Sequence, residues 1–265
     1  MMIKETLKKV VEIAVKAGDA IIEVYNSDNF DVQTKGDNSP LTRADLTAHH
    51  IIVGALEQLT PEIPVLSEES STIPYEERKH WTKFWLVDPL DGTKEFIKRN
   101  GEFTVNIALI DNQKPVMGVV YAPVLNRTYY AAENIGAYVQ YEGNQAQEIH
   151  VADYRQQQLK VVASRSHAGP DLQRFLDKIG DYSVISMGSS LKLCLVAEGK
   201  AHLYPRLGPT MEWDTAASHA VVNAAGGQVT NLEKESLVYN KENLLNPYFM
   251  VCGEPAYEWD IILNK

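Results

Sequence analysis

The run Trp85-Leu86-Val87-Asp88-Pro89-Leu90-Asp91-Gly92-Thr93 decides how this chain is built around its candidate site. The residues numbered 84–87 are continuously apolar, which predicts a strand buried on both faces. The two carboxylates that follow, three residues apart on a turn held by Pro and Gly, can point at one metal cluster at the end of that strand. The glycine lets a bound oxyanion approach the backbone closely. The run therefore predicts a combined metal and phosphate site.

Two further acidic segments supply candidate ligands from distant parts of the chain. Glu68 follows a short apolar run, and Asp214 follows a tryptophan at the start of a predicted helix. Mg²⁺ prefers oxygen ligands in octahedral geometry, and two such ions roughly 3.5–4 Å apart can clamp both oxygens of a phosphoryl displacement. The set indicates a magnesium-dependent phosphatase. Its candidate metal ligands are Glu68, Asp88, the backbone carbonyl of Leu90, Asp91 and Asp214.

Water activation is assigned to a pair of side chains, Asp45 and Thr93. Asp45 would polarise the Thr93 hydroxyl, which in turn would orient a metal-bound water. Each residue also has a purely structural interpretation. Asp45 would favour the positive end of a helix dipole, Thr93 would be the N-cap of a helix over residues 94–97, and Asp214 would be an N-cap as well. Glu68 taken alone is typical of a solvated loop. Only the joint occurrence with D-P-x-D-G-T favours the metal site.

Composition restricts the class of partner. The chain has 265 residues, 45% of them hydrophobic, and a formal net charge of −10. Such an acidic surface argues against a nucleic-acid polymer, which needs clustered Lys and Arg, but not against a small anion held by cations. The two cysteines, Cys194 and Cys252, form no metal-binding motif and are expected to be reduced thiols. With no signal-peptide or membrane-spanning pattern, we expect a cytoplasmic protein, at most peripheral on the inner membrane.

Hydrophobic spacing predicts an α+β N-terminal part followed by an α/β C-terminal part. Thr42 and Asp45 form a predicted capping box at the start of the second helix. A strand and a turn are expected over 27–39, a charged loop over 71–83 and an antiparallel meander over 103–141. A seam near 150–158 divides the chain into lobes 1–155, with most metal ligands, and 156–265. Predicted helices cover 3–26, 42–59, 170–179, 190–197 and 215–225, and predicted strands cover 84–87, 103–110, 115–121, 128–132, 137–141, 159–163, 182–186, 201–204, 228–230 and 248–252.

Four segments together resemble the inositol monophosphatase-like, lithium-sensitive phosphatase superfamily. They are a P-x-T-x-A-D segment, a Glu-Glu pair, the motif W-x-x-D-P-[ILV]-D-G-T and the motif W-D-x-A-[AG]. In this chain they stand at residues 40–45, 68–69, 85–93 and 213–217. The resemblance implies a layered αβαβα sandwich of the inositol monophosphatase and fructose-1,6-bisphosphatase type. It also implies two or three Mg²⁺ ions, with the metal ligands and the water-activating pair named above.

The segments 188–199 and 204–210 are similar to one branch, the 3′(2′),5′-bisphosphate nucleotidases of the CysQ type. This resemblance implies hydrolysis of adenosine 3′,5′-bisphosphate to AMP and phosphate, in sulfate assimilation and nucleotide recycling. Lys192, a cation that could meet the second phosphate, is otherwise typical of an exposed helix. The implied substrate-binding residues are Glu68, Leu90, Asp91, Gly92, Thr93, Ser189, Ser190, Lys192 and Asp214.

Three alternatives remain open at this stage. A sister phosphatase acting on inositol phosphates or fructose 1,6-bisphosphate would use the same fold and metals. A catalytically silent nucleotide sensor would retain the fold without turnover. A haloacid-dehalogenase-type enzyme would form an aspartyl phosphate, but its motif D-x-D-G-T differs in spacing from the D-x-x-D found here. The expected partner is a small nucleotide bisphosphate, and the oligomeric state is open between monomer and homodimer.

Overall fold

A computed structural model describes residues 3–27, 30–34, 40–70, 72–142, 144–156, 158–164, 170–253 and 255–256. In these residues the helices are α1 (Ile3–Tyr25), α2 (Arg43–Leu59), α3 (Tyr75–Arg78), α4 (Thr93–Ile97), α5 (Pro170–Ile179), α6 (Leu191–Ala197) and α7 (Glu212–Ala224), with 3-10 turns η1 (Glu68–Ser70) and η2 (Tyr154–Gln156). The strands are β1 (Gln33–Thr34), β2 (Pro40–Leu41), β3 (Val65–Ser67), β4 (Lys83–Asp91), β5 (Thr104–Asp111), β6 (Lys114–Ala122), β7 (Arg127–Ala132), β8 (Gly136–Tyr141), β9 (Gln147–Glu148), β10 (Leu159–Ser164), β11 (Tyr182–Met187), β12 (Leu203–Arg206), β13 (Gln228–Asn231) and β14 (Phe249–Cys252).

Two sheets dominate the described part of the chain. The first has seven strands in the order β3-β4-β5-β6-β7-β8-β9, with β3 parallel to β4 and the remaining neighbours antiparallel. The second has five strands in the order β11-β10-β12-β14-β13, and its β10, β11 and β12 are parallel. The antiparallel meander predicted for the N-terminal part and the α/β character predicted for the C-terminal part are both confirmed.

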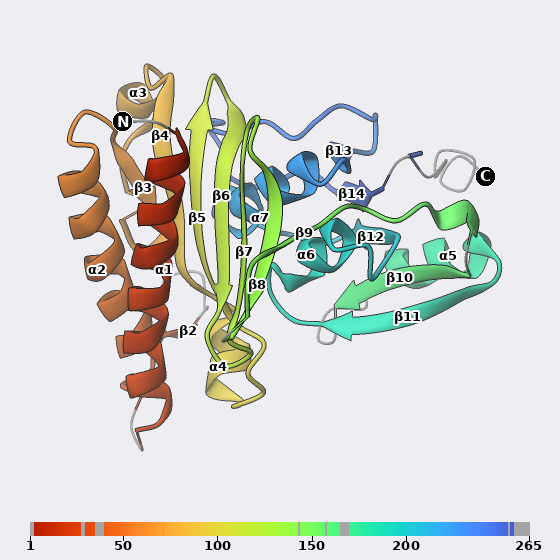
Figure 1. Ribbon diagram of the computed structural model, residues 1–265, viewed down its shortest axis with the longest axis horizontal. Helices are drawn as coiled ribbons and strands as arrows, with labels where there is room; N and C mark the ends of the chain where they lie inside the picture. The colour runs from red at the N-terminus through yellow and green to blue at the C-terminus, as the bar shows by residue number, and fades with distance from the viewer. Residues whose placement is uncertain are drawn as a thin grey trace.

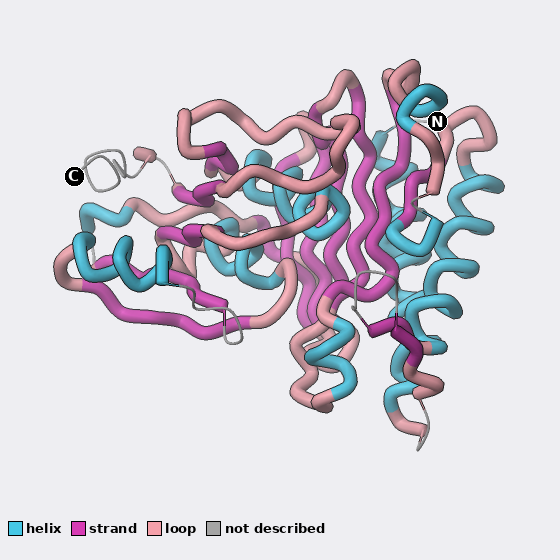
Figure 2. Tube along the Cα trace, turned by 180° about the vertical axis from the view of Figure 1, so that it is seen from behind, coloured by secondary structure: helices cyan, strands magenta, loops and turns pink. Residues whose placement is uncertain are grey.

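Helices and sheets alternate in five layers (Figure 1). Helices α1 and α2 cover one face of the seven-stranded sheet, α6 and α7 lie between the two sheets, and α5 packs on the far face of the five-stranded sheet. Seen from behind, the long strands of the first sheet run beside the α1–α2 pair (Figure 2). The predicted layered αβαβα sandwich is therefore confirmed. The division into lobes at residue 155 stays a prediction.

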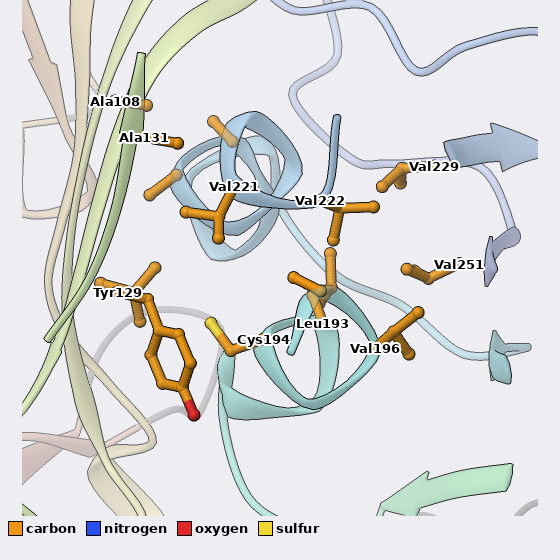
Figure 3. Packing of buried hydrophobic residues seen from close by; sticks show 14 of the residues in the cluster. Ala108, Tyr129, Ala131, Leu193, Cys194, Val196, Val221, Val222, Val229 and Val251 are labelled. Carbon is orange, nitrogen blue, oxygen red and sulfur yellow. The ribbon is translucent and has the colours of Figure 1, made fainter. Parts of the chain in front are cut away.

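Buried apolar side chains fill the space between adjacent layers. Between the two sheets, α6 and α7 bury Cys194 and Val221 toward Tyr129 of β7, and Val196 and Val222 toward the second sheet (Figure 3). A helix that lies between two sheets packs on both of its sides, so it is expected to be apolar on both. The helix α1, in contrast, buries a single stripe against the first sheet and α2. The middle layer therefore joins both halves of the chain in one core.

Several predicted boundaries are wrong in detail. The loop expected over 71–83 contains α3, and the helix expected from residue 215 begins three residues earlier, at Glu212. Strand β4 does not end before the motif but continues through it to Asp91. Strand β12 lies two residues later than predicted at both ends. The strand expected within residues 27–39 is found as β1, whereas the equally short β2 and β9 escaped prediction because two residues show no periodicity. Residues 28–29 and 35–39 of the predicted turn segment lie outside the described residues.

Helix α7 approaches the backbone of β6 at Gly118. A Cβ atom at this position would lie 2.1 Å from the carbonyl oxygen of Ala217. Only a residue without a side chain allows this contact, because overlapping atoms force the helix away from the sheet. Gly118 thus sets the depth at which α7, the helix that carries Asp214, lies on the first sheet.

Gly118→Ala is expected to lower the free energy of unfolding by about 3 kcal/mol, since overpacking of a tight contact forces backbone shifts. The melting temperature measured by calorimetry should fall by roughly 6–12 °C. Gly54→Ala in α2 is the matched control, because a Cβ there meets no atom within 4 Å. That control should raise stability by about 0.5–1 kcal/mol. Equal melting temperatures for the two variants would contradict the close-contact argument.

Candidate active site

The carboxyl ends of two parallel strands bring the first acidic residues together. Ser67 at the end of β3 pairs in register with Val87 of β4. The next residues, Glu68 and Asp88, are therefore neighbours at the point where β3 ends, although β4 continues to Asp91. Glu68 is half-buried in η1, and Asp88 is 1% exposed. The alternative interpretation of Glu68 as a residue of a solvated loop is therefore wrong.

The D-P-L-D motif forms an irregularity in β4. The pairing of β4 with β5 shifts register between Asp88 and Asp91, as a β-bulge does when it re-aims side chains. The Oδ1 atom of Asp88 accepts the N–H of Leu90 at 3.0 Å. Gly92 then takes φ +94°, a left-handed conformation that favours glycine. The bulge and this turn carry the chain into α4 at the lower end of the sheet in Figure 1.

Asp45 and Thr93 are joined although 48 residues separate them. The Thr93 hydroxyl donates to Oδ1 of Asp45 at 3.1 Å, and Oδ2 of Asp45 accepts the backbone N–H of Thr42 at 2.8 Å. The capping box is thus confirmed, and the same carboxylate reaches the motif. Gly92 is the N-cap of α4 and Thr93 its first residue. The interpretation of Thr93 as N-cap is therefore wrong.

Asp214 lies in the first turn of α7, at the third helical position. Its Oδ2 accepts the N–H of the N-cap residue Met211 at 2.9 Å. The interpretation of Asp214 as the N-cap is wrong. Because the helix N-terminus carries partial positive charge, the position favours the ionised carboxylate.

Ser190, the N-cap residue of α6, connects the middle layer to the motif. Its N–H and its Oγ lie 2.6 Å from Oδ2 of Asp91, and the Oγ also lies 2.9 Å from the carbonyl oxygen of Asp214. The Asn106 amide donates to Ser190 Oγ at 2.7 Å. Ser190 is 2% exposed. These contacts hold Asp91 in one orientation.

Two adjoining cavities surround these groups. The first, of about 230 Å³, is lined by Glu68, Asp88, Leu90, Asp91, Thr93 and Asp214, among others. The second, of about 110 Å³, is lined by Ser189, Ser190, Lys192, Tyr204, Arg206 and Thr210, among others. Both share Asp91, Gly92, Glu95 and Asp214. All predicted site residues except Asp45, which contacts the site through Thr93, therefore line one of two connected spaces.

Negative charge accumulates in the first cavity. Burial and then the charges of Glu68, Asp91, Asp214 and Asp45 raise the pKa of Asp88 well above its usual range. Burial, followed by Asp91 and Glu68, likewise raises the pKa of Asp214, although the N–H of Met211 opposes this shift. Among the described residues, no three His, Cys, Asp or Glu side chains are close enough to form a complete metal cage as they stand. The clustered oxygen donors still fit a hard cation, which would relieve their repulsion.

Positive charge faces the second cavity. Lys192 is 7% exposed, so the interpretation as an exposed helix lysine is wrong. Burial lowers the pKa of Lys192 to about 8, while Asp91 opposes this shift. Its Nζ donates to the carbonyl of Ser189 at 2.5 Å and lies 5.7 Å from the ring centre of Tyr204. The Nε of Arg206 is buried and has no hydrogen-bond partner in the described part of the chain.

Three residues at the site were missed from the sequence. Asn106 interrupts the apolar run of residues 105–110, which is a detectable sign of a polar role. Glu95 stands two residues after the D-G-T motif and lines both cavities. Arg206 lies in a segment used for the resemblance but received no role. Only its tertiary placement beside Lys192 shows that it belongs to the site.

Five alternating layers around a carboxylate-lined cavity define the class of layered αβαβα phosphatases. The chain belongs to the inositol monophosphatase family, whose model matches residues 2–253. No helix in the described residues has the length and apolarity that crossing a bilayer requires.

Similar proteins cover nearly the whole chain. The 3′(2′),5′-bisphosphate nucleotidase CysQ of Escherichia coli O6:H1 is 55% identical over 247 residues, which are 92% of this chain and 98% of that protein. The crystal structure of CysQ from Bacteroides thetaiotaomicron is 45% identical, with a TM-score of 0.85 over 96% of this chain and 99% of the other. The suhB protein of Bartonella henselae is 27% identical, with a TM-score of 0.78 over 94% of each chain.

Proposed function

We propose that this protein is a magnesium-dependent phosphatase that hydrolyses the 3′-phosphate of adenosine 3′,5′-bisphosphate to give AMP and phosphate. One observation carries the proposal. The acidic cavity adjoins a second cavity that Lys192 and Arg206 line, and the two cavities share Asp91 and Asp214. A substrate with two anionic groups fits this pair of cavities, because one group would meet the metals and the other Lys192 and Arg206. The relatives named 3′(2′),5′-bisphosphate nucleotidase support the same substrate class.

The proposed cation ligands are the carboxylates of Glu68, Asp88, Asp91 and Asp214 with the carbonyl of Leu90. Two or three Mg²⁺ ions, when bound, would lower the pKa of a water and neutralise charge on the phosphate. The buried N–H and Oγ contacts from Ser190 keep Asp91 aimed at the shared part of the two cavities. We infer that Ser190 acts mainly by holding Asp91, in addition to its predicted contact with substrate.

The chain supplies the proton acceptor itself. Thr93 donates a hydrogen bond from its hydroxyl to Asp45, so Thr93 Oγ1 can accept a hydrogen bond from a neighbouring water. As that water attacks, its proton would pass to Oγ1 while the Thr93 proton passes to Asp45. Asp45 is oriented in turn by Thr42. The first N–H groups of α4, from Gly92 and Thr93, lack intrahelical partners and would bind phosphate oxygens.

The second anion would lie against Lys192 and Arg206. The unpartnered Nε of Arg206 is a donor that a ligand oxygen would satisfy, since buried donors without partners are costly. Lys192 is held against Ser189 and Tyr204 in a defined position. A monophosphate ester would bring no second anion to Lys192 and to the buried Nε of Arg206, so the cavity favours bisphosphates.

Lys192→Ala is expected to lower kcat/KM for adenosine 3′,5′-bisphosphate by about 30–100-fold, as expected for loss of a buried charged partner worth about 2–3 kcal/mol. Hydrolysis of inositol 1-phosphate should change less than about 3-fold. Steady-state phosphate release with both substrates measures the difference. The control is Lys16→Ala, an exposed lysine of α1. Equal losses on both substrates would remove Lys192 from the specificity argument.

A substrate panel tests the function. Released phosphate is measured with Mg²⁺ for adenosine 3′,5′-bisphosphate, 3′-phosphoadenosine 5′-phosphosulfate, inositol 1-phosphate and fructose 1,6-bisphosphate. The proposal expects the highest kcat/KM for one of the two adenosine substrates. Preference for inositol 1-phosphate would favour a sister phosphatase, and no turnover would favour a silent sensor. Trapping of a phosphorylated enzyme would contradict the direct attack by water.

A further inference from the structure

We propose that His49 is a positioning residue that holds the ligand Glu68 in place through the hydroxyl of Ser67. The Nδ1 atom of His49 lies 2.8 Å from Oγ of Ser67, a side chain that is completely buried. Ser67 is the last residue of β3 and directly precedes Glu68. The contact therefore restrains the point from which a proposed cation ligand leaves the sheet.

Helix α2 makes hydrogen bonds to residues on two sides of the acidic cavity. Asp45 and His49 are four residues apart, so they lie on the same face of α2. Asp45 contacts Thr93 at the end of β4, whereas His49 contacts Ser67 at the end of β3. The same helix packs against β3 and η1. One rigid element thus fixes the spacing between the proposed water-activating pair and Glu68.

The physical basis is that hydrogen bonds from neighbouring residues hold a metal-ligating side chain in position. Glu68 lies in η1, a 3-10 turn of three residues, and the hydrogen bonds of such a turn have poorer geometry than those of an α-helix. Hydrogen bonds behind a ligand fix its orientation, and their loss typically costs 10–100-fold in metal affinity. Asp91 receives this support from Ser190, and Asp214 from the Met211 N–H. For Glu68 the corresponding support reaches its neighbour Ser67 from His49.

The test measures cation binding without substrate. Mg²⁺ is titrated by calorimetry into the wild-type protein and into His49→Ala, His49→Asn and Ser67→Ala. His49→Ala is expected to raise the dissociation constant about 10-fold or more. His49→Asn should restore most of the affinity, because its amide can occupy the place of Nδ1. Ser67→Ala should match His49→Ala, and the double variant should lose no more than either one.

The matched control is His50→Ala, which removes the exposed neighbouring ring, 5.3 Å from that of His49, without removing the contact to Ser67. Its Mg²⁺ affinity should stay within about 2-fold of wild type, well short of the 10-fold expected for loss of the supporting contact. Wild-type affinity in His49→Ala, an equal loss in His50→Ala, or no restoration by His49→Asn would overturn the inference. The inference rests on the proposed function, because it takes Glu68 as a cation ligand. Failure of the wild-type protein to bind Mg²⁺ would overturn both, whereas wild-type binding with an unaffected His49→Ala would overturn the positioning role alone.

Discussion

Asp91→Asn is expected to lower kcat by about 10³-fold, equivalent to about 4 kcal/mol of transition-state stabilisation. The substitution keeps the shape of the side chain and an oxygen that can accept the hydrogen bonds from Ser190. It removes the negative charge through which this residue would hold a cation at the junction of the two cavities. Turnover of adenosine 3′,5′-bisphosphate with saturating Mg²⁺ is the measurement.

The fold should survive this change. The charge of Asp91 raises the pKa of both Asp88 and Asp214, so it repels them when no cation is bound. Removing that charge is expected to leave the melting temperature in a chelator unchanged or slightly higher. Asp19→Asn, an exposed residue of α1, is the matched control and should retain full activity. Near-normal turnover of Asp91→Asn would refute its assignment as a metal ligand.

Thr93→Ala is expected to reduce kcat by about 10²–10³-fold, within the range usual for a positioned proton acceptor. The substitution removes the hydroxyl that links Asp45 to the water, and KM should change little. Thr93→Ser retains the hydroxyl and should keep activity within about 10-fold of wild type. Phosphate release measured with each variant separates the hydroxyl from the methyl group.

The pair should behave as one unit. Because Thr93 donates to Asp45, loss of either member removes the same proton path, and the double variant Thr93→Ala with Asp45→Asn should be little worse than the poorer single variant. Thr47→Ala is the control, since its hydroxyl donates within α2, to the carbonyl of Arg43, at 2.8 Å. Additive losses in the double variant would contradict a shared path.

Local sequence patterns were sufficient for most of the secondary structure. The strand 84–87, the meander that follows it and the helix 170–179 carry clear periodicity, and a periodicity depends only on neighbouring residues. The capping box of Thr42 and Asp45 is equally local. The errors fall where the pattern is interrupted. Strand β4 continues through Pro89 because a bulge accommodates a residue that ordinary strand pairing rejects.

Some features of the candidate site could likewise be predicted from local sequence, and others could not. The motifs were enough to nominate Asp88, Asp91 and Asp214, because their spacing is rare. The motifs do not show that Lys192 is buried, because its burial depends on the elements that pack against α6 and not on the sequence of that helix. The sequence alone suggested an exposed lysine as an equal alternative. Tyr204 and Arg206 of β12 decide the matter by lining the same cavity.

The sequence by itself determined the kinds of element and the acidic residues of the site, because both follow from short-range spacing of side chains, and the resemblance of its motifs implied the layered class. Only the tertiary structure decided which of these residues meet. Ser190 bonds Asp91 across 99 residues, and His49 bonds Ser67 across 18. Such contacts depend on strand register and on how closely the layers pack, as at Gly118. Neither quantity is encoded in the pattern of any one segment, since both arise when separate segments share one core.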